Sequence, residues 1–217
     1  MDNLAAARSQ MGISLAFHII FAVIGVALPL MMTIAEWRFR ATGDAAYLLL
    51  AKRWARGTTI LFAVGAVSGT VLSFELGLLW PQFMQYAGAV IGMPFSLEGF
   101  AFFTEAIFLG IYLYGWGRIP GWFHLLSGFI VAASGLLSAT FVTFVNGWMN
   151  TPAGFDLVDG KFVNIHPFTA FNTRRPVFRE SHGSVPFRRT QIRREFLIAS
   201  YSISAFRYAQ IQKHMHR

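Results

Sequence analysis

The sequence predicts an all-α, polytopic membrane helix bundle with four transmembrane helices in this chain and an irregular basic C-terminal tail. Apolar residues make up 55% of the 217-residue chain and charged residues only 13%, about half the charged share of a typical soluble domain. Four apolar runs are each long enough to cross a bilayer core, which takes roughly 20 helical residues. The charge is also unevenly placed, because the last fifty residues account for the whole net charge of +8.

The four predicted spans follow one another in the first 149 residues. They run from about residue 11 to 35, 58 to 80, 95 to 116 and 121 to 145. The first run is too long for the apolar core of a signal peptide, and further spans follow it. We therefore divide the chain into a four-helix transmembrane region at 1–149, an outer-side loop at 150–171 and a basic tail at 172–217.

The connections between the spans predict their orientation. Residues 36–57 carry five Lys or Arg, the 81–94 connection carries none, and the 117–121 connection carries one. The positive-inside rule places the first and third of these connections in the cytoplasm. The N-terminus, the 81–97 loop and everything after Asn146 are then expected on the outer side.

Four ionisable side chains fall in the outer half of the predicted membrane region: His18 in the first span, Glu75 in the second, and Glu98 and Glu105 in the third. Glu98 and Glu105 are seven positions apart, so a helix places them on one face. A charge at the bilayer centre costs about 2.5–3.5 kcal/mol on insertion scales, and such residues normally face a partner, a cofactor or water. We interpret the four as one site facing inward. The alternative is that the glutamates are protonated or at the headgroup boundary, and that His18 is a packing histidine.

Three kinds of function are compatible with these residues. A proton or ion pathway needs a chain of acids, and Glu98 with Glu105 supplies two steps. A haem site needs an imidazole for the iron and apolar walls, and His18 lies between Phe17 and Ile19. A non-redox membrane helper needs neither. The chain has no cysteine and no phosphate-loop, HExxH or GxSxG motif, so thiolate metal sites and nucleotide, zinc or serine hydrolysis find no support.

Several motifs carry a resemblance to a known family. In order and spacing, the chain resembles subunit I of the cytochrome bd-type quinol oxidases, and "FELGLLWP" is similar to the cyanide-insensitive branch in particular. The resemblance covers about residues 5–171 and is carried by "FHIIFAVIGVALPL", "SGTVLSFELGLLWPQFM", "GMPFSLEGFAFFTEAIFLGIYLYGW" and "NGWMNTPAGF".

The resemblance implies an oxidoreductase of aerobic respiration that oxidises a membrane quinol and reduces dioxygen to water. It implies haem b and haem d (or a second haem b) as cofactors, and subunit II and the lipid bilayer as partners, with no nucleic acid. By the same resemblance, His18 ligates haem iron, Glu98 and Glu105 help to deliver protons, and Glu75 lies near a haem. The implied location is the bacterial inner membrane, multi-pass, with the N-terminus outside.

The resemblance ends near residue 172. The family would continue into a fifth apolar span with a haem-ligating histidine, whereas residues 168–217 hold ten basic and two acidic residues. His182 lies in a polar stretch and is not assigned as a ligand. We expect a frame change or truncation near residue 172, and a piece that is not active alone. The alternative for the tail is a basic amphipathic segment that binds anionic lipid or nucleic acid. The alternative for the whole chain is a non-redox membrane helper or a proton- or ion-conducting protein.

Overall fold

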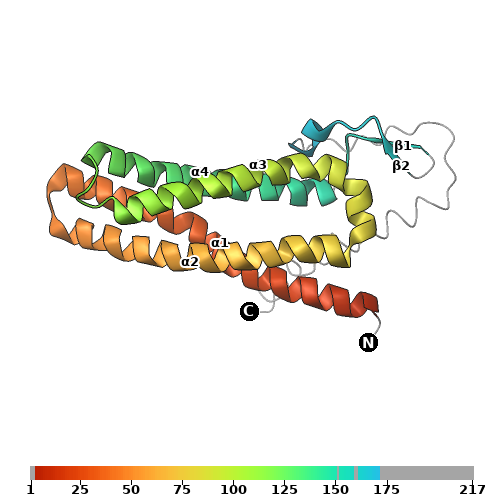
Figure 1. Ribbon diagram of the computed structural model, residues 1–217, viewed down its shortest axis with the longest axis horizontal. Coiled ribbons are helices and arrows are strands. Elements are labelled where there is room, and N and C mark those ends of the chain that lie inside the picture. Colours follow the sequence, from red (N-terminus) through yellow and green to blue (C-terminus); the bar gives the residue numbers. More distant parts are fainter. Residues whose placement is uncertain (1–2, 151, 159–160, 172–217) are drawn as a thin grey trace, which may run out of the picture. The chain divides into compact units, whose positions relative to one another are not determined.

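The computed structural model describes residues 3–150, 152–158 and 161–171. Figure 1 shows the four long helices of this part of the chain: α1 (Asn3–Thr42), α2 (Ala45–Leu79), α3 (Pro81–Tyr114) and α4 (Gly121–Asn150). Each of them is long and apolar enough to cross a membrane. The predicted all-α fold with four transmembrane helices is confirmed, while the tail at 172–217 lies outside the described residues.

The predicted loop at 81–97 is wrong and the 36–57 connection is largely helical, because the helices are longer than the apolar runs. The 36–57 segment is helical except at Gly43 and Asp44, and the 81–97 segment belongs to α3. The residues flanking the apolar runs include Ala, Leu, Lys and Arg, which are good helix formers. The 40 residues of α1 would extend about 60 Å, twice the roughly 30 Å of a bilayer core.

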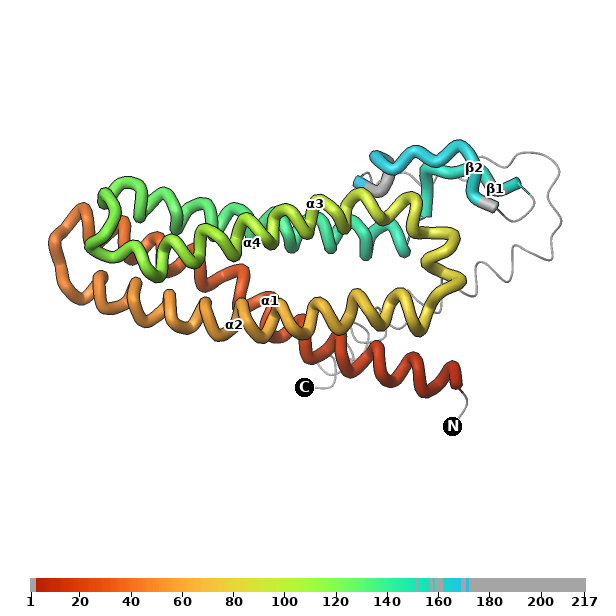
Figure 2. The backbone as a smooth tube through the Cα atoms, viewed as in Figure 1, coloured from red at the N-terminus to blue at the C-terminus, as the bar shows by residue number. Residues whose placement is uncertain are grey.

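Local chemistry explains where the helices stop. Gly43 has φ of 72°, a left-handed conformation that glycine adopts without strain, and its N–H donates to the Phe39 carbonyl at 2.8 Å. The Asp44 carboxylate then accepts from the Ala46 N–H at 2.8 Å and caps the start of α2. Between α2 and α3 only Trp80 is non-helical, and Figure 2 shows the chain turning sharply after the end of α2.

The described chain forms two compact units. One of them contains residues 17–69 and 97–140, and thus a segment of each of the four helices. Its buried apolar cluster consists of Met32, Ala55, Leu109, Tyr112 and Val131. At Gly128 of α4, a Cβ atom would lie 2.8 Å from the Thr33 hydroxyl of α1 and 2.9 Å from the Tyr112 ring of α3. A small residue there lets the helices approach closely, as is common between membrane helices.

The other unit contains residues 3–16, 70–96 and the described residues between 141 and 171. Its core is a cluster of buried side chains: Met11, Trp80, Phe83, Ala87, Val90, Ile91, Val145, Trp148 and Met149. The segment predicted as an outer-side loop at 150–171 contains an antiparallel hairpin, β1 (Asp156–Val158) with β2 (Lys161–Val163), and the short 3-10 helix η1 (Pro167–Phe171).

Aromatic contacts hold this hairpin segment together. The Phe155 and Phe162 rings stack at 3.7 Å between their centroids. The Trp148 indole N–H donates to the Ala153 carbonyl at 2.8 Å. The segment therefore packs on the end of α4, and the stacked Phe155 and Phe162 rings hold the hairpin against its own preceding residues.

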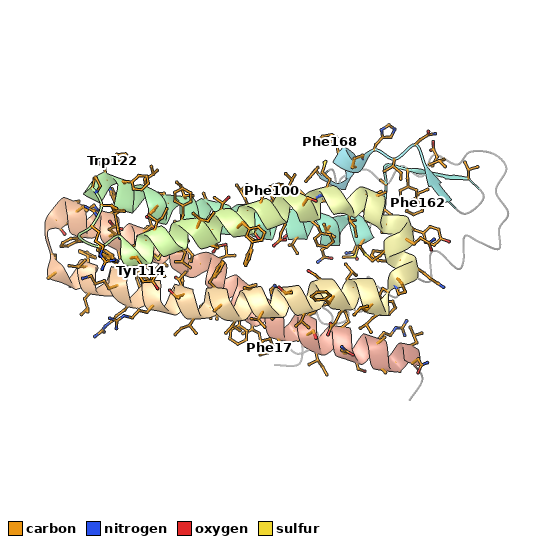
Figure 3. The ribbon with its side chains drawn as sticks, viewed as in Figure 1. Phe17, Phe100, Tyr114, Trp122, Phe162 and Phe168 are labelled. Carbon is orange, nitrogen blue, oxygen red and sulfur yellow. The ribbon has the colours of Figure 1, made fainter. Side chains whose placement is uncertain are left out.

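Large apolar side chains also cover the outside of the helices. Phe100 of α3 is 72% exposed and Trp122 of α4 is 69% exposed, and Figure 3 shows both as labelled sticks on the helices. In water such exposure would be unfavourable, but against lipid it is not. The helices therefore have the surface of membrane-spanning segments.

Candidate functional site

His18 lies on α1 and contacts α2. Its Nδ1 is 2.8 Å from the Ser68 hydroxyl oxygen, and a Cβ atom at Gly69 would lie 3.2 Å from its Cε1. The ring is half-buried, and the neighbouring Phe17 and Phe21 rings lie 4.7 Å apart between their centroids, in a tilted arrangement. Among the described residues no hydrogen-bond partner is found for Nε2, so this nitrogen is open to a ligand.

Glu98 and Glu105 of α3 both face α4. The Ser138 hydroxyl donates to Glu98 Oε1 at 3.1 Å. A Cβ atom at Gly135 would lie 3.2 Å from both carboxylate oxygens of Glu105. Gly135 and Ser138 are three residues apart and so share one face of α4, which explains why both glutamates meet this face.

Glu105 is the more deeply placed of the two acids. Its side chain is 8% exposed, and within the described residues it has no hydrogen-bond partner. A buried carboxyl without partners is costly when ionised. Such a group marks a place where a proton, water or cofactor is expected to complete the site.

Glu75 lies on α2, in the unit that also contains the start of α1. Its Oε1 accepts from the Gln10 amide at 3.1 Å and from the Ser14 hydroxyl at 2.7 Å. Its side chain is buried, and Oε2 has no partner in the part of the chain that the structure describes. Glu75 is therefore held by the first helix, through residues that lie before His18 in the sequence.

The structure does not gather these residues into a protein-only metal centre. Within residues 3–171, apart from the undescribed positions, no three His, Asp or Glu side chains are placed to hold a metal ion together. A haem needs only an axial ligand from the protein, because the macrocycle supplies the other nitrogens. The His18 imidazole, packed against Gly69 and with no Nε2 partner in the described part of the chain, fits that requirement.

A second buried polar cluster was missed by the sequence interpretation. The His124 Nδ1 lies 2.8 Å from Glu36 Oε1, and its Nε2 lies 2.9 Å from the Tyr112 carbonyl oxygen. The Arg40 guanidinium also donates to Glu36 Oε1, through Nε at 2.8 Å. Both ring nitrogens of His124 face acceptors, so an imidazolium paired with the Glu36 carboxylate satisfies the geometry. This cluster ties α1, α3 and α4 together.

The residues that contact His18, Glu98 and Glu105 were also missed by the sequence interpretation. They are Ser68, Gly69, Gly135 and Ser138. Small and hydroxyl residues are frequent in membrane helices in general, so their presence did not single them out. A signal existed for Glu36 and His124, because both lie at the predicted cytoplasmic ends of their spans.

A comparison with known protein families identifies the family of the chain. Residues 6–213 match the family described as cytochrome bd terminal oxidase subunit I. The chain belongs to this family. The match confirms the resemblance seen in the motifs and extends into the undescribed tail.

Relatives of this cytochrome bd subunit I chain are found in two well-studied bacteria. The first, from Bacillus subtilis (strain 168), is 41% identical over 171 residues and is provisionally named as a cytochrome bd menaquinol oxidase subunit I. A cytochrome bd ubiquinol oxidase subunit 1 from the same organism is 33% identical over 162 residues. The cytochrome bd-II ubiquinol oxidase subunit 1 of Escherichia coli (strain K12) is 31% identical over 159 residues.

These alignments cover 79%, 74% and 72% of this chain but only 39%, 35% and 31% of the relatives. The chain therefore spans less than half the length of the curated relatives it matches. The solved structure of the bd oxidase from Geobacillus thermodenitrificans is similar, with a TM-score of 0.76 and 45% identity. That comparison covers 97% of this chain and 46% of the other. The chain is thus a multi-pass membrane protein of this family.

Proposed function

We propose that this chain forms the haem-bearing part of subunit I of a terminal quinol oxidase, which oxidises a membrane quinol and reduces dioxygen to water. Family membership supports the reaction class. The observation that carries the proposal is His18, whose imidazole is fixed by Ser68 and Gly69 while Nε2 has no hydrogen-bond partner among the described residues. The full activity belongs to the complete subunit together with subunit II, in the bacterial inner membrane with the N-terminus outside.

His18 would hold the iron of a haem through Nε2. When bound, haem b or haem d supplies the iron at which dioxygen is reduced. The protein contributes an oriented imidazole and an apolar environment with few competing donors. Glu75, held by Gln10 and Ser14, is the second residue that we assign to a haem environment.

Glu98 and Glu105 would supply protons to the site. Reduction of dioxygen to water consumes protons as well as electrons, so a membrane-buried site needs groups that can hold and pass them. Glu105 is a buried acid without a partner among the described residues, and Glu98 shares its face and accepts from Ser138. Each carboxyl can hold a proton, and because Glu98 and Glu105 are seven residues apart on α3, roughly 10 Å along the helix, water would carry a proton between them.

A visible absorption spectrum tests this proposal. Membranes containing the full-length gene product should show reduced-minus-oxidised haem bands, and His18→Ala should remove the bands of one haem. His166→Ala is the matched control, because His166 is exposed and lies in the hairpin segment. A purified protein without colour would contradict the proposal and favour a non-redox or ion-conducting function for the same acids.

A further inference from the structure

The Ser68 hydroxyl has three polar neighbours but only one hydrogen to donate. Its oxygen lies 2.8 Å from His18 Nδ1. The same hydroxyl donates to the Val64 carbonyl oxygen at 2.8 Å, with the Gly65 carbonyl oxygen at 3.3 Å. Val64, Gly65, Ser68 and Gly69 all belong to α2, so the imidazole of α1 meets a fixed feature of the neighbouring helix.

The position of the protons follows from the chemistry of the partners. A carbonyl oxygen can only accept, whereas a hydroxyl can both donate and accept. When the Ser68 hydroxyl donates to the Val64 carbonyl of its own helix, its oxygen is left to accept from His18. His18 Nδ1 must then carry a hydrogen, and in a neutral imidazole the lone pair lies on Nε2.

We propose that Ser68 is a positioning residue that fixes His18 in the Nδ1–H tautomer and so presents the Nε2 lone pair to haem iron. The inference deepens the proposed function and rests on it for the identity of the ligand. Gly69 contributes to the same end, since a side chain there would press on His18 Cε1 at 3.2 Å. The ring is thus held from one side by a hydrogen bond and from another by backbone.

This role differs from that of a hydrogen bond that only stabilises the fold. Ligating histidines generally donate their other N–H to an oxygen, which fixes the tautomer and raises the basicity of the ligand, and loss of such a partner costs about 10–100-fold in metal affinity or activity. A purely structural bond would change stability but would leave the His18 tautomer and the iron–imidazole bond unaltered.

The tautomer can be measured on the full chain before any haem is added. The chain is labelled with ¹⁵N-histidine in lipid nanodiscs, and the His18 signals are assigned by their loss in His18→Gln. We expect the Nδ1–H form in the wild type and in Ser68→Thr, which retains a hydroxyl. In Ser68→Ala we expect a shift toward the Nε2–H form. An Nε2–H tautomer in the wild type, or no change in Ser68→Ala, would overturn the inference.

The haem-loaded protein gives the second readout. In ferrous, haem-loaded Ser68→Ala the iron–imidazole stretching frequency should fall, and haem affinity should fall about 10–100-fold. Ser68→Thr should restore both. Ser96→Ala is the matched control, because the Ser96 hydroxyl also donates to a carbonyl four residues earlier, that of Gly92, from an exposed position.

The two proposals fail in different ways. A wild-type protein that binds no haem at His18 defeats the proposed function, whatever the tautomer is. A wild-type protein that binds haem at His18, with a stretching frequency and affinity unaltered by Ser68→Ala, defeats the positioning role and leaves the proposed function standing.

Discussion

Removing His124 should destabilise the protein measurably, because the side chain is fully buried and makes two hydrogen bonds. Its bond to the Glu36 carboxylate contributes about 1.5–3 kcal/mol and its bond to the Tyr112 carbonyl about 0.5–1.5 kcal/mol, on typical values for charged and neutral partners. The Arg40 guanidinium keeps donating to Glu36, so the carboxylate retains a counter-ion. We therefore expect His124→Ala to lower the free energy of unfolding by about 2–4 kcal/mol.

The assay is unfolding of the detergent-solubilised protein by SDS, followed by circular dichroism. At the lower limit, 2 kcal/mol corresponds to an unfolding constant raised about thirtyfold. His166→Ala, at an exposed position, should change little.

A double-mutant cycle measures the interaction free energy between His124 and Glu36. Glu36→Ala combined with His124→Ala should cost at least about 1 kcal/mol less than the two single changes added together, because both remove the same interaction. Free energies that add within about 0.5 kcal/mol would refute the buried pair. So would a His124→Ala protein as stable as the wild type.

Three further predictions concern the acids, the topology and the tail. Glu105→Gln keeps the size of the side chain but cannot carry a proton, so oxygen consumption by the assembled enzyme should fall about 100-fold with haem content unchanged. Thr104→Ala, at the half-buried neighbouring position, is the control, and full activity of Glu105→Gln would exclude the proton role. A tag inserted between Gly43 and Asp44 should react only from the cytoplasmic side of spheroplasts, since the adjoining segment is basic; labelling from outside would reverse the orientation. Translation of the other two reading frames downstream of residue 172 should reveal apolar spans with a histidine in a helical context. Stop codons throughout those frames would contradict the frame change. The basic tail would then be expected to bind lipid in a salt-sensitive way.

The sequence was sufficient for the number and order of the helices, because apolar runs of bilayer length have few alternative structures. The sequence did not predict where the helices end. Counting apolar residues detects only the part that meets lipid, so the helical continuation through 36–57 and 81–97 was read as connection. The 156–163 hairpin was missed because two three-residue strands give too short a pattern, and their stability comes from Phe155 stacking on Phe162.

The candidate site was predictable only one helix at a time. The seven-residue spacing correctly places Glu98 and Glu105 on one face, as the local geometry of any helix requires. The partners of that face, Ser138 and Gly135, depend on how α3 meets α4, which no local pattern encodes. The same holds for Ser68 beside His18 and for His124, which is 88 positions from Glu36.

The central claim is that His18 is an axial ligand to haem in an oxygen-reducing quinol oxidase. A cryo-electron microscopy map of the full-length gene product assembled with subunit II tests it most directly. We expect density for a haem whose iron is bonded to His18 Nε2, with the His18 Nδ1 still against the Ser68 hydroxyl and with Glu98 and Glu105 lining the same site. A map with haem bound by other residues, and with His18 packed between helices without a ligand, would contradict it.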